Sequence, residues 1–62
     1  MEDERLKFMR IFNDLPEKVR REEIVVIVDD KPYTWNSAFI EVRNNTKLGK
    51  NMLAKLKLLG IL

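Results

Sequence analysis

Two helices separated by a short break are expected within residues 34–60, TWNSAFIEVRNNTKLGKNMLAKLKLLG. Thr34 is a good N-cap for a helix over residues 35–44, because a threonine hydroxyl can accept a hydrogen bond from the first turn. Residues 44–46, Asn-Asn-Thr, then interrupt the helical pattern. Asparagine tolerates the left-handed conformation that ends a helix, and threonine can cap the next one. The second helix is therefore expected over residues 47–59.

This second helix has one apolar and one basic side. At about 100° per residue, its apolar arc holds Leu48, Met52, Leu53, Leu56 and Leu59. The opposite arc carries Lys47, Lys50, Asn51, Ala54, Lys57 and Leu58, with Lys55 at the boundary. Lys47 and Lys50 lie in the first turn, where cations oppose the helix macrodipole, so a bound anion would explain them. A solvated lysine face is the alternative. Gly60 is expected to stop the helix.

The N-terminal part predicts a further helix over residues 3–14. Apolar side chains recur there at helical spacing, at Phe8, Ile11, Phe12 and Leu15. Residues 14–17, Asp-Leu-Pro-Glu, indicate a restart, with the aspartate as cap and the proline in the first turn. A short second helix to about Glu22 is expected, or else one helix that is kinked at the proline.

A β-hairpin is expected between these helical parts. Residues 24–28, Ile-Val-Val-Ile-Val, are all β-branched, which favours a strand, and the lack of alternation predicts burial on both faces. Asp29-Asp30 suits a two-residue turn, and residues 31–34 return as a second strand. Pro32 cannot donate to a strand ladder, so this second strand is expected to be short and at an edge.

These elements predict a small, mostly helical α+β fold, with residues 1–62 as a single domain. An N-terminal helix, a hairpin of about residues 23–34 and a C-terminal helix pair pack together. A buried Ile61 is expected to tie the apolar tail to the hairpin. The predicted core is Phe8, Ile11, Phe12, Leu15, Val19, Val25, Ile27, Trp35, Phe39, Val42, Leu48, Met52, Leu53, Leu56 and Leu59.

The composition argues against catalysis, and we expect no enzyme activity, no metal and no cofactor. The 62 residues include no Cys and no His, which removes the thiolate nucleophile and the commonest general base. Ser37 is the only serine and has no paired base nearby. Gly49-Lys50 resembles the end of a phosphate loop, but Asn44 stands where that loop requires its first glycine.

Part of the chain resembles a known family. Residues 35–62 are similar to the helix pair of winged-helix regulators, in which L-x-x-L-x-x-x-G and two apolar residues end the recognition helix. The matching positions here are Leu53, Leu56, Gly60, Ile61 and Leu62. The resemblance implies nucleic-acid binding. In that role the residues facing the groove would be Thr46, Lys47, Lys50 and Asn51.

Two features depart from that family. It usually has a branched apolar residue where this chain has Gly49, and the given sequence stops at Leu62, before the position of the wing hairpin. Residues 15–62 also resemble short archaeal proteins of unknown function, and the abundance of Lys, Arg and Glu is typical of thermophiles.

Three kinds of binding function remain. The leading hypothesis is a protein-interaction or oligomerisation module that uses Leu58, Ile61 and Leu62, including the case of a soluble piece of a larger, membrane-attached protein. The second is a helix-turn-helix-like nucleic-acid-binding module. Residues 31–62 hold one acid and six bases, a net charge of +5, which suits a polyanion. Membrane-surface binding is a weaker third, and no small-molecule substrate is evident. A cytoplasmic location, or the cytoplasmic side of a membrane, is expected.

Overall fold

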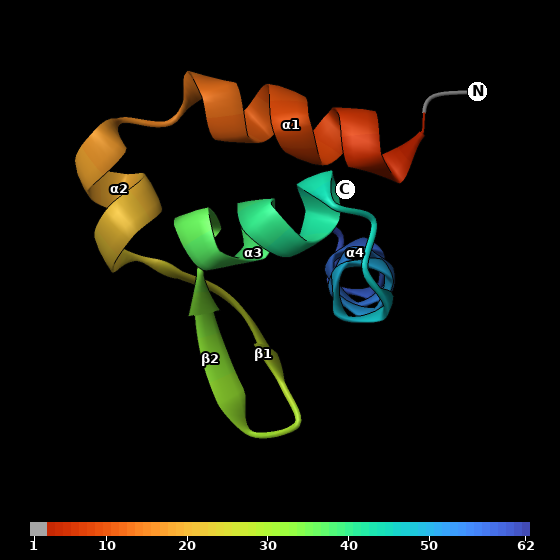
Figure 1. Ribbon diagram of the computed structural model, residues 1–62. Coiled ribbons are helices and arrows are strands. Elements are labelled where there is room, and N and C mark those ends of the chain that lie inside the picture. The colour runs from red at the N-terminus through yellow and green to blue at the C-terminus, as the bar shows by residue number, and fades with distance from the viewer. Residues whose placement is uncertain (1–2) are drawn as a thin grey trace.

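The computed structural model describes residues 3–62, where four helices accompany one two-stranded antiparallel sheet (Figure 1). The α+β class predicted from the sequence is confirmed, and the helix pair and hairpin lie where expected. In chain order the elements are α1 (Glu4–Asp14), α2 (Glu17–Glu22), β1 (Ile24–Val28), β2 (Lys31–Thr34), α3 (Trp35–Arg43) and α4 (Lys47–Leu58).

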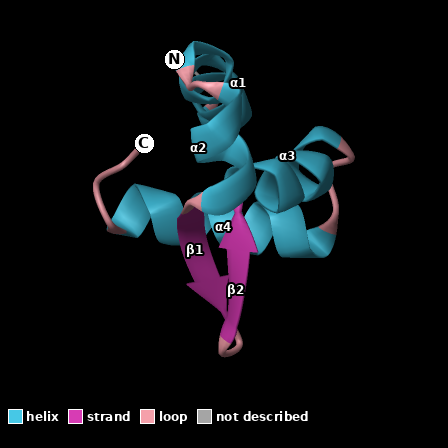
Figure 2. Ribbon diagram, turned by 90° about the vertical axis from the view of Figure 1, so that its left-hand side faces the viewer, coloured by secondary structure: helices cyan, strands magenta, loops and turns pink. Residues whose placement is uncertain are grey.

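Helix α3 is the centre of the fold, since it contacts all five other elements. In Figure 1, α1 runs along α3 on one side and the hairpin projects from the other. Helix α4 is seen nearly end-on in that view, so it crosses α3 steeply. Figure 2 is turned by 90° and shows α4 across the view, with α1 above it and the hairpin below. One side of α4 is exposed along its length, at Lys47, Lys50, Asn51, Ala54 and Leu58.

Helices α1 and α2 are two separate helices rather than one kinked helix. Leu15 is extended, with φ −85° and ψ 142°, because the residue before a proline is disfavoured in helical conformation. The predicted capping by Asp14 is wrong: Asp14 is the last residue of α1, and Pro16 occupies the N-cap of α2 without a side-chain hydrogen bond. At the start of α1, the Asp3 carboxylate accepts a hydrogen bond of 2.9 Å from the Arg5 amide.

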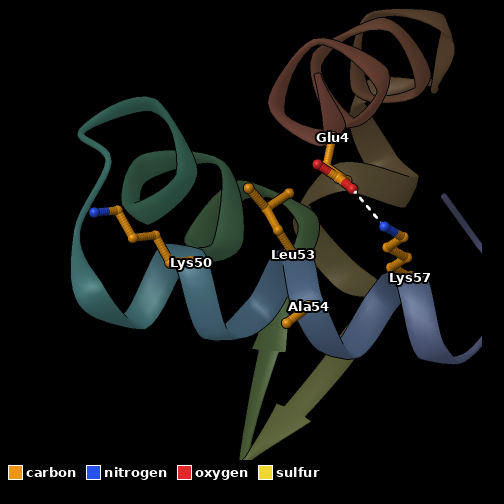
Figure 3. A pocket seen from close by; sticks show the side chains of 5 residues that line it. All are labelled: Glu4, Lys50, Leu53, Ala54 and Lys57. Atoms are coloured by element: carbon orange, nitrogen blue, oxygen red, sulfur yellow. Dashed lines mark ion pairs between the residues drawn. The ribbon is translucent and has the colours of Figure 1, made fainter. Parts of the chain in front are cut away.

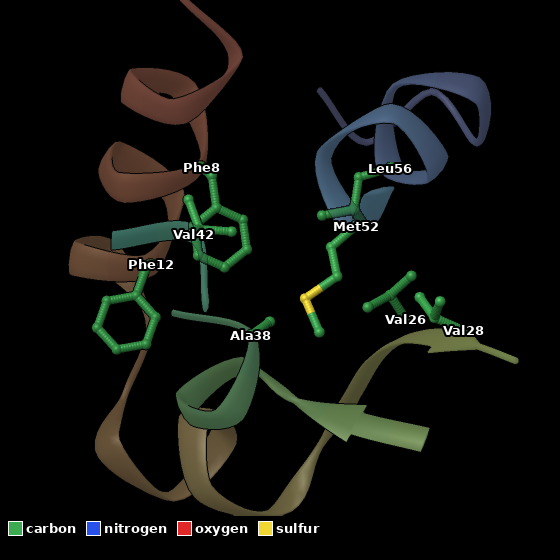
Figure 4. Packing of buried hydrophobic residues seen from close by; sticks show 8 residues of the cluster. All are labelled: Phe8, Phe12, Val26, Val28, Ala38, Val42, Met52 and Leu56. Carbon is green, nitrogen blue, oxygen red and sulfur yellow. The ribbon is translucent and has the colours of Figure 1, made fainter. Parts of the chain in front are cut away.

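The core is an aromatic stack between α1 and α3, continued by apolar side chains towards β1 and α4. Figure 4 shows the buried members of this core, with Phe8 and Phe12 as its aromatic residues. The Phe12 ring stacks on Phe39 with centroids 4.3 Å apart, and the Phe8 ring meets Trp35 at 5.6 Å. The Arg20 guanidinium of α2 lies 4.5 Å from the Phe12 ring centroid. The buried side chains are Phe8, Phe12, Val26, Val28, Ala38, Val42, Met52 and Leu56.

Two predicted core residues are wrong, because Ile27 is 53% exposed and Leu59 is 63% exposed. Strand β1 is not buried on both faces: Val26 and Val28 face the core, whereas Ile27 between them faces outward. The two-stranded sheet has only one face packed on the helices, so the side chains alternate. The other predicted core residues are partly buried, namely Ile11, Leu15, Val19, Val25, Trp35, Phe39, Leu48 and Leu53.

The C-terminal tail turns towards α1 and not towards the hairpin. Gly60 has φ +80°, a left-handed conformation that favours glycine, and the Ile61 amide donates to the Leu56 carbonyl at 3.0 Å. The predicted burial of Ile61 against the hairpin is wrong, since Ile61 is 41% exposed. Ile61 and Leu62 border a shallow cavity beside Ile11 of α1, and Leu62 packs against the core.

The hairpin turn has the geometry that its length requires. Asp29 and Asp30 have φ of 51° and 66°, as expected for a two-residue turn of the primed type. Val28 pairs with Lys31 next to the turn, and Ile27 lies opposite Pro32. Because hydrogen-bonded and non-hydrogen-bonded pairs alternate, Pro32 falls at a position where the ladder needs no donor.

The turn predicts a difference between two substitutions at position 30. Asp30→Gly removes the cost of a left-handed side-chain-bearing residue, so its free energy of unfolding should be unchanged or up to about 1 kcal/mol higher. Asp30→Ala also leaves a side-chain-bearing residue in the left-handed conformation, but it lacks the short polar side chain that makes this conformation less costly for aspartate. Its free energy of unfolding should therefore fall by about 1 kcal/mol. Urea unfolding followed by circular dichroism measures both; a loss of stability in the glycine variant would contradict the turn geometry.

Phe12 is predicted to be a major source of stability. Phe12→Ala empties the space between Phe39 and Arg20 and should cost about 3 kcal/mol or more. A chain of this length has only about 3 to 9 kcal/mol in total, so the variant should be largely unfolded at moderate temperature by circular dichroism. Ile40→Ala, at a 54% exposed site on α3, is the control and should melt like the parent. A cooperative Phe12→Ala melt near the parental temperature would be inconsistent with this packing.

Candidate functional site

The turn between α3 and α4 orients the basic helix, and local rules build it. Asn45 is left-handed, with φ 55°, and its amide donates to the Val42 carbonyl at 3.1 Å. The Thr46 amide donates to the Glu41 carbonyl at 3.2 Å, which completes the hydrogen-bond pattern of a Schellman motif. The chain thus ends α3 and begins α4 within residues 44–46, as the sequence predicted.

Thr46 joins the two helices with its side chain. Its hydroxyl donates a hydrogen bond to Glu41 Oε1 at 2.8 Å. The Thr46 hydroxyl oxygen also accepts a hydrogen bond of 3.0 Å from the Gly49 amide. Both functions of the hydroxyl are therefore used inside the protein. Of the four residues predicted to face a nucleic acid, Thr46 serves as a helix cap and holds the Glu41 carboxylate near the start of α4.

Gly49 allows α4 to approach α3 closely. A Cβ added at this position would lie 2.4 Å from the Glu41 carbonyl oxygen and 2.9 Å from the Val42 nitrogen, both of them backbone atoms. No side chain fits there without moving one helix away from the other. The departure from the winged-helix pattern at this position thus has a packing reason in this chain.

The exposed face of α4 has two tethered edges. On the edge beside the hairpin, Lys55 Nζ donates to the Ile27 carbonyl of β1 at 2.7 Å. On the edge beside α1, Lys57 Nζ lies 3.0 Å from Glu4 Oε1. The hydrogen bond from the Lys57 ammonium lowers the pKa of the Glu4 carboxyl below its ordinary value. Sequence reasoning missed both tethers, because the partners are far away in the chain and no local pattern signals them.

The predicted anion-binding residues of α4 lie between these edges. Lys47, Lys50 and Asn51 are exposed, and within residues 3–62 no ion pair engages either lysine. Ala54 and Leu58 continue the same stripe, and Leu58 is 87% exposed. We call this stripe the α4 face; it comprises Lys47, Lys50, Asn51, Ala54 and Leu58.

A shallow cavity of about 340 Å³ borders the α4 face on the side of α1 (Figure 3). Leu53 and Ala54 contribute its apolar lining, and Glu4, Lys50 and Lys57 its charged groups. Figure 3 shows Lys57 directed at Glu4, whereas Lys50 extends away from that ion pair. Lys57 is therefore partly neutralised, and Lys50 is the lysine of this cavity that is available to an external anion.

The three residues predicted as protein contacts do not form one surface. Leu58 lies on the α4 face, whereas Ile61 and Leu62 lie beside α1, with Leu62 partly buried. Within the described residues, no group of three or more Asp, Glu, His or Cys side chains is placed to hold a metal ion. None of the helices in residues 3–62 is long and apolar enough to cross a bilayer.

The position of the hairpin relative to the helix pair α3–α4 differs from the winged-helix order. Here the hairpin β1–β2 comes directly before the pair, and its two strands pair only with each other. A wing hairpin, by contrast, follows the recognition helix. Comparison of the chain with family models, curated protein sequences and solved structures finds no match.

The helix contact predicts that Gly49→Ala is destabilising. Alanine raises helix propensity by about 1 kcal/mol, but the overlap with the α3 backbone should outweigh that gain, for a net loss of about 1 to 3 kcal/mol. Thermal unfolding of Gly49→Ala beside Lys50→Ala, a control on the same turn, measures the difference. A stabilised Gly49→Ala would mean that α3 and α4 do not approach as described.

Proposed function

We propose that this protein binds nucleic acid through the α4 face. The observation that carries the proposal is that the uncovered side of α4 displays Lys47, Lys50 and Asn51 and no acid. Residues 47–62 contain four lysines and no Asp or Glu, although the whole chain has a net charge of only +2. Such a concentration of one charge sign on a helix favours a polyanionic partner.

The shape of this part of the molecule suits a duplex. Helix α4 is the second helix of a steeply crossed pair, and its 12 residues span about 18 Å. Ala54 lies near the middle of the α4 face. Its short side chain does not protrude where the helix would enter a groove. The major groove of B-DNA is about 12 Å wide and accommodates a helix.

The residues of the α4 face divide into two roles. Lys47 and Lys50 are placed to contact phosphates, which position a protein but carry little sequence information. Asn51 can donate and accept hydrogen bonds at once, as recognition of an adenine edge requires, and Leu58 offers an apolar contact of the kind that thymine methyl groups accept. The Glu41 carboxylate near the helix start opposes an anion there, so we assign the phosphate contacts to the ammonium groups of Lys47 and Lys50 rather than to the free amides of the helix end.

Two free lysines imply weak, salt-sensitive binding. Each phosphate contact contributes about 0.9 to the slope of log affinity against log salt, so Lys47 and Lys50 together give a slope of about −2. Non-specific affinities of this kind are in the range of about 10⁻⁴ to 10⁻⁶ M.

Protein interaction is the second candidate function. A specific observation favours it: the exposed apolar side chains Ile24, Ile27 and Leu59 all border one groove beside β1. That groove lies on the flank of α4 next to the hairpin, outside the α4 face.

The proposal is tested by reversing charge on the α4 face. Lys47→Glu with Lys50→Glu should lower affinity for duplex DNA at least tenfold at low salt, while the fold stays intact because both side chains are exposed and neither makes an ion pair within residues 3–62. The matched control is Lys18→Glu with Lys31→Glu, which changes the net charge equally at exposed sites outside α4. Fluorescence anisotropy at two salt concentrations measures affinity, and amide chemical shifts locate the contact.

Two results would count against the proposal. In the first, duplex DNA at low salt causes no amide shifts over residues 46–58 of the parent protein. In the second, the control pair loses as much affinity as the α4 pair, which would show that net charge matters and this face does not. Single-stranded DNA run in parallel distinguishes groove binding from simple phosphate attraction, and Asn51→Ala should reduce sequence preference more than affinity.

A further inference from the structure

Strand β1 has a free edge on the side away from β2. Ile27 stands at a non-hydrogen-bonded position opposite Pro32, so its amide and carbonyl point outward from the hairpin. The hydrogen bond from Lys55 Nζ to the Ile27 carbonyl, at 2.7 Å, is consistent with that direction. Free strand edges are templates for pairing with another chain, and lysine is a common device that protects them.

An apolar groove runs along this edge. Its volume is about 280 Å³, and it lies between β1 and the C-terminal end of α4. Ile24 is 49% exposed, Ile27 53% and Leu59 63%, so large side chains border the groove with much of their surface in water. A cluster of exposed apolar side chains beside an unpaired strand edge is a feature of surfaces that receive an added strand.

The charged residues around β1 indicate which kind of segment would bind at its edge. Exposed acids stand at both ends of β1, with Glu22 and Glu23 before the strand and Asp29 and Asp30 after it. The cations near these acids are Arg21, which forms an ion pair with Glu17, Lys31 on β2 and Lys55 in the groove. We propose that the β1 edge binds an extended segment of a partner protein, apolar in its middle and basic at both ends, as an added strand of the sheet.

A second copy of this chain fits the edge poorly. Strand β1 has a bulge at Val25, between the pairs that Ile24 and Val26 make with β2, so the outward-pointing amide and carbonyl on which a pairing can be built are those of Ile27. In an antiparallel pair of two β1 strands, the exposed acids Glu22 and Glu23 of one copy lie near Asp29 and Asp30 of the other, at both ends of the pair. Like charges directly opposite each other destabilise strand pairs. The acids therefore disfavour self-pairing and favour a partner with lysine or arginine at these positions.

Lys55 controls access to the edge. Its ammonium occupies the outward carbonyl of Ile27, which an added strand needs as an acceptor. The partner strand therefore displaces this hydrogen bond when it binds. Replacing Lys55 by methionine keeps the aliphatic stem and frees the carbonyl, so affinity for the strand should rise.

The test compares two synthetic peptides on the parent protein. Both have an alternating Val-Thr middle of five residues; one carries two lysines at each end and the other two glutamates. The basic peptide should shift the amide signals of residues 24–28 and bind at least tenfold more tightly than the acidic one. Lys55→Met should tighten its binding several-fold, whereas Lys50→Met, with the same loss of charge outside the groove, should change it little.

Several outcomes would overturn the inference. Equal binding of the two peptides would show that charge does not select the bound segment. The absence of amide shifts in β1 with the basic peptide would show that the segment does not bind at this edge. Concentration-dependent broadening of β1 signals without peptide would identify a second copy as the occupant. An unchanged affinity of Lys55→Met for the basic peptide would show that the Lys55 side chain does not compete with the added strand for the Ile27 carbonyl. The peptide comparison uses the parent protein, so its result holds even if Lys55→Met fails to fold. It also does not depend on whether the α4 face binds DNA.

Discussion

The contact between Gly49 and the end of α3 is the constraint on which the rest of the structure depends. The backbone of α4 lies against Glu41 and Val42 there, with no room for a Cβ atom. The Thr46 hydroxyl fixes the same junction through hydrogen bonds to Glu41 and Gly49. Because α3 contacts every other element, the direction in which α4 leaves α3 decides which of its side chains reach the core.

The tethering of α4 at its two edges shapes both proposed surfaces. Lys57 is paired with Glu4 of α1, and Lys55 with the Ile27 carbonyl of β1. The exposed ion pair of Lys57 adds little to stability, and we expect the same of the exposed hydrogen bond of Lys55, so the main effect of both is on the surface that they leave. One effect is to leave Lys47 and Lys50 as the free cations of the α4 face. The other is to cover the acceptor at the β1 edge that an incoming strand would use.

Local features were predicted well because they follow from a few adjacent residues. The left-handed Asn45, the caps at Thr34 and Thr46 and the turn at Asp29-Asp30 each depend on backbone geometry within one turn. The cap expected at Asp14 failed because Pro16 forced Leu15 into an extended conformation, which ended α1 first. The candidate lysines were found from helical spacing, but spacing could not separate free lysines from tethered ones.

By itself, the sequence determined the order and type of the elements and the placing of apolar and basic arcs on α4, because side-chain periodicity and capping act over short distances. Only the tertiary structure decided that Ile27 faces outward while Val26 and Val28 face the core, since that depends on which face of the hairpin the helices cover. It also decided which lysines are tethered. Those hydrogen bonds join residues far apart in the chain, and their geometry exists only once α4 has packed across α3.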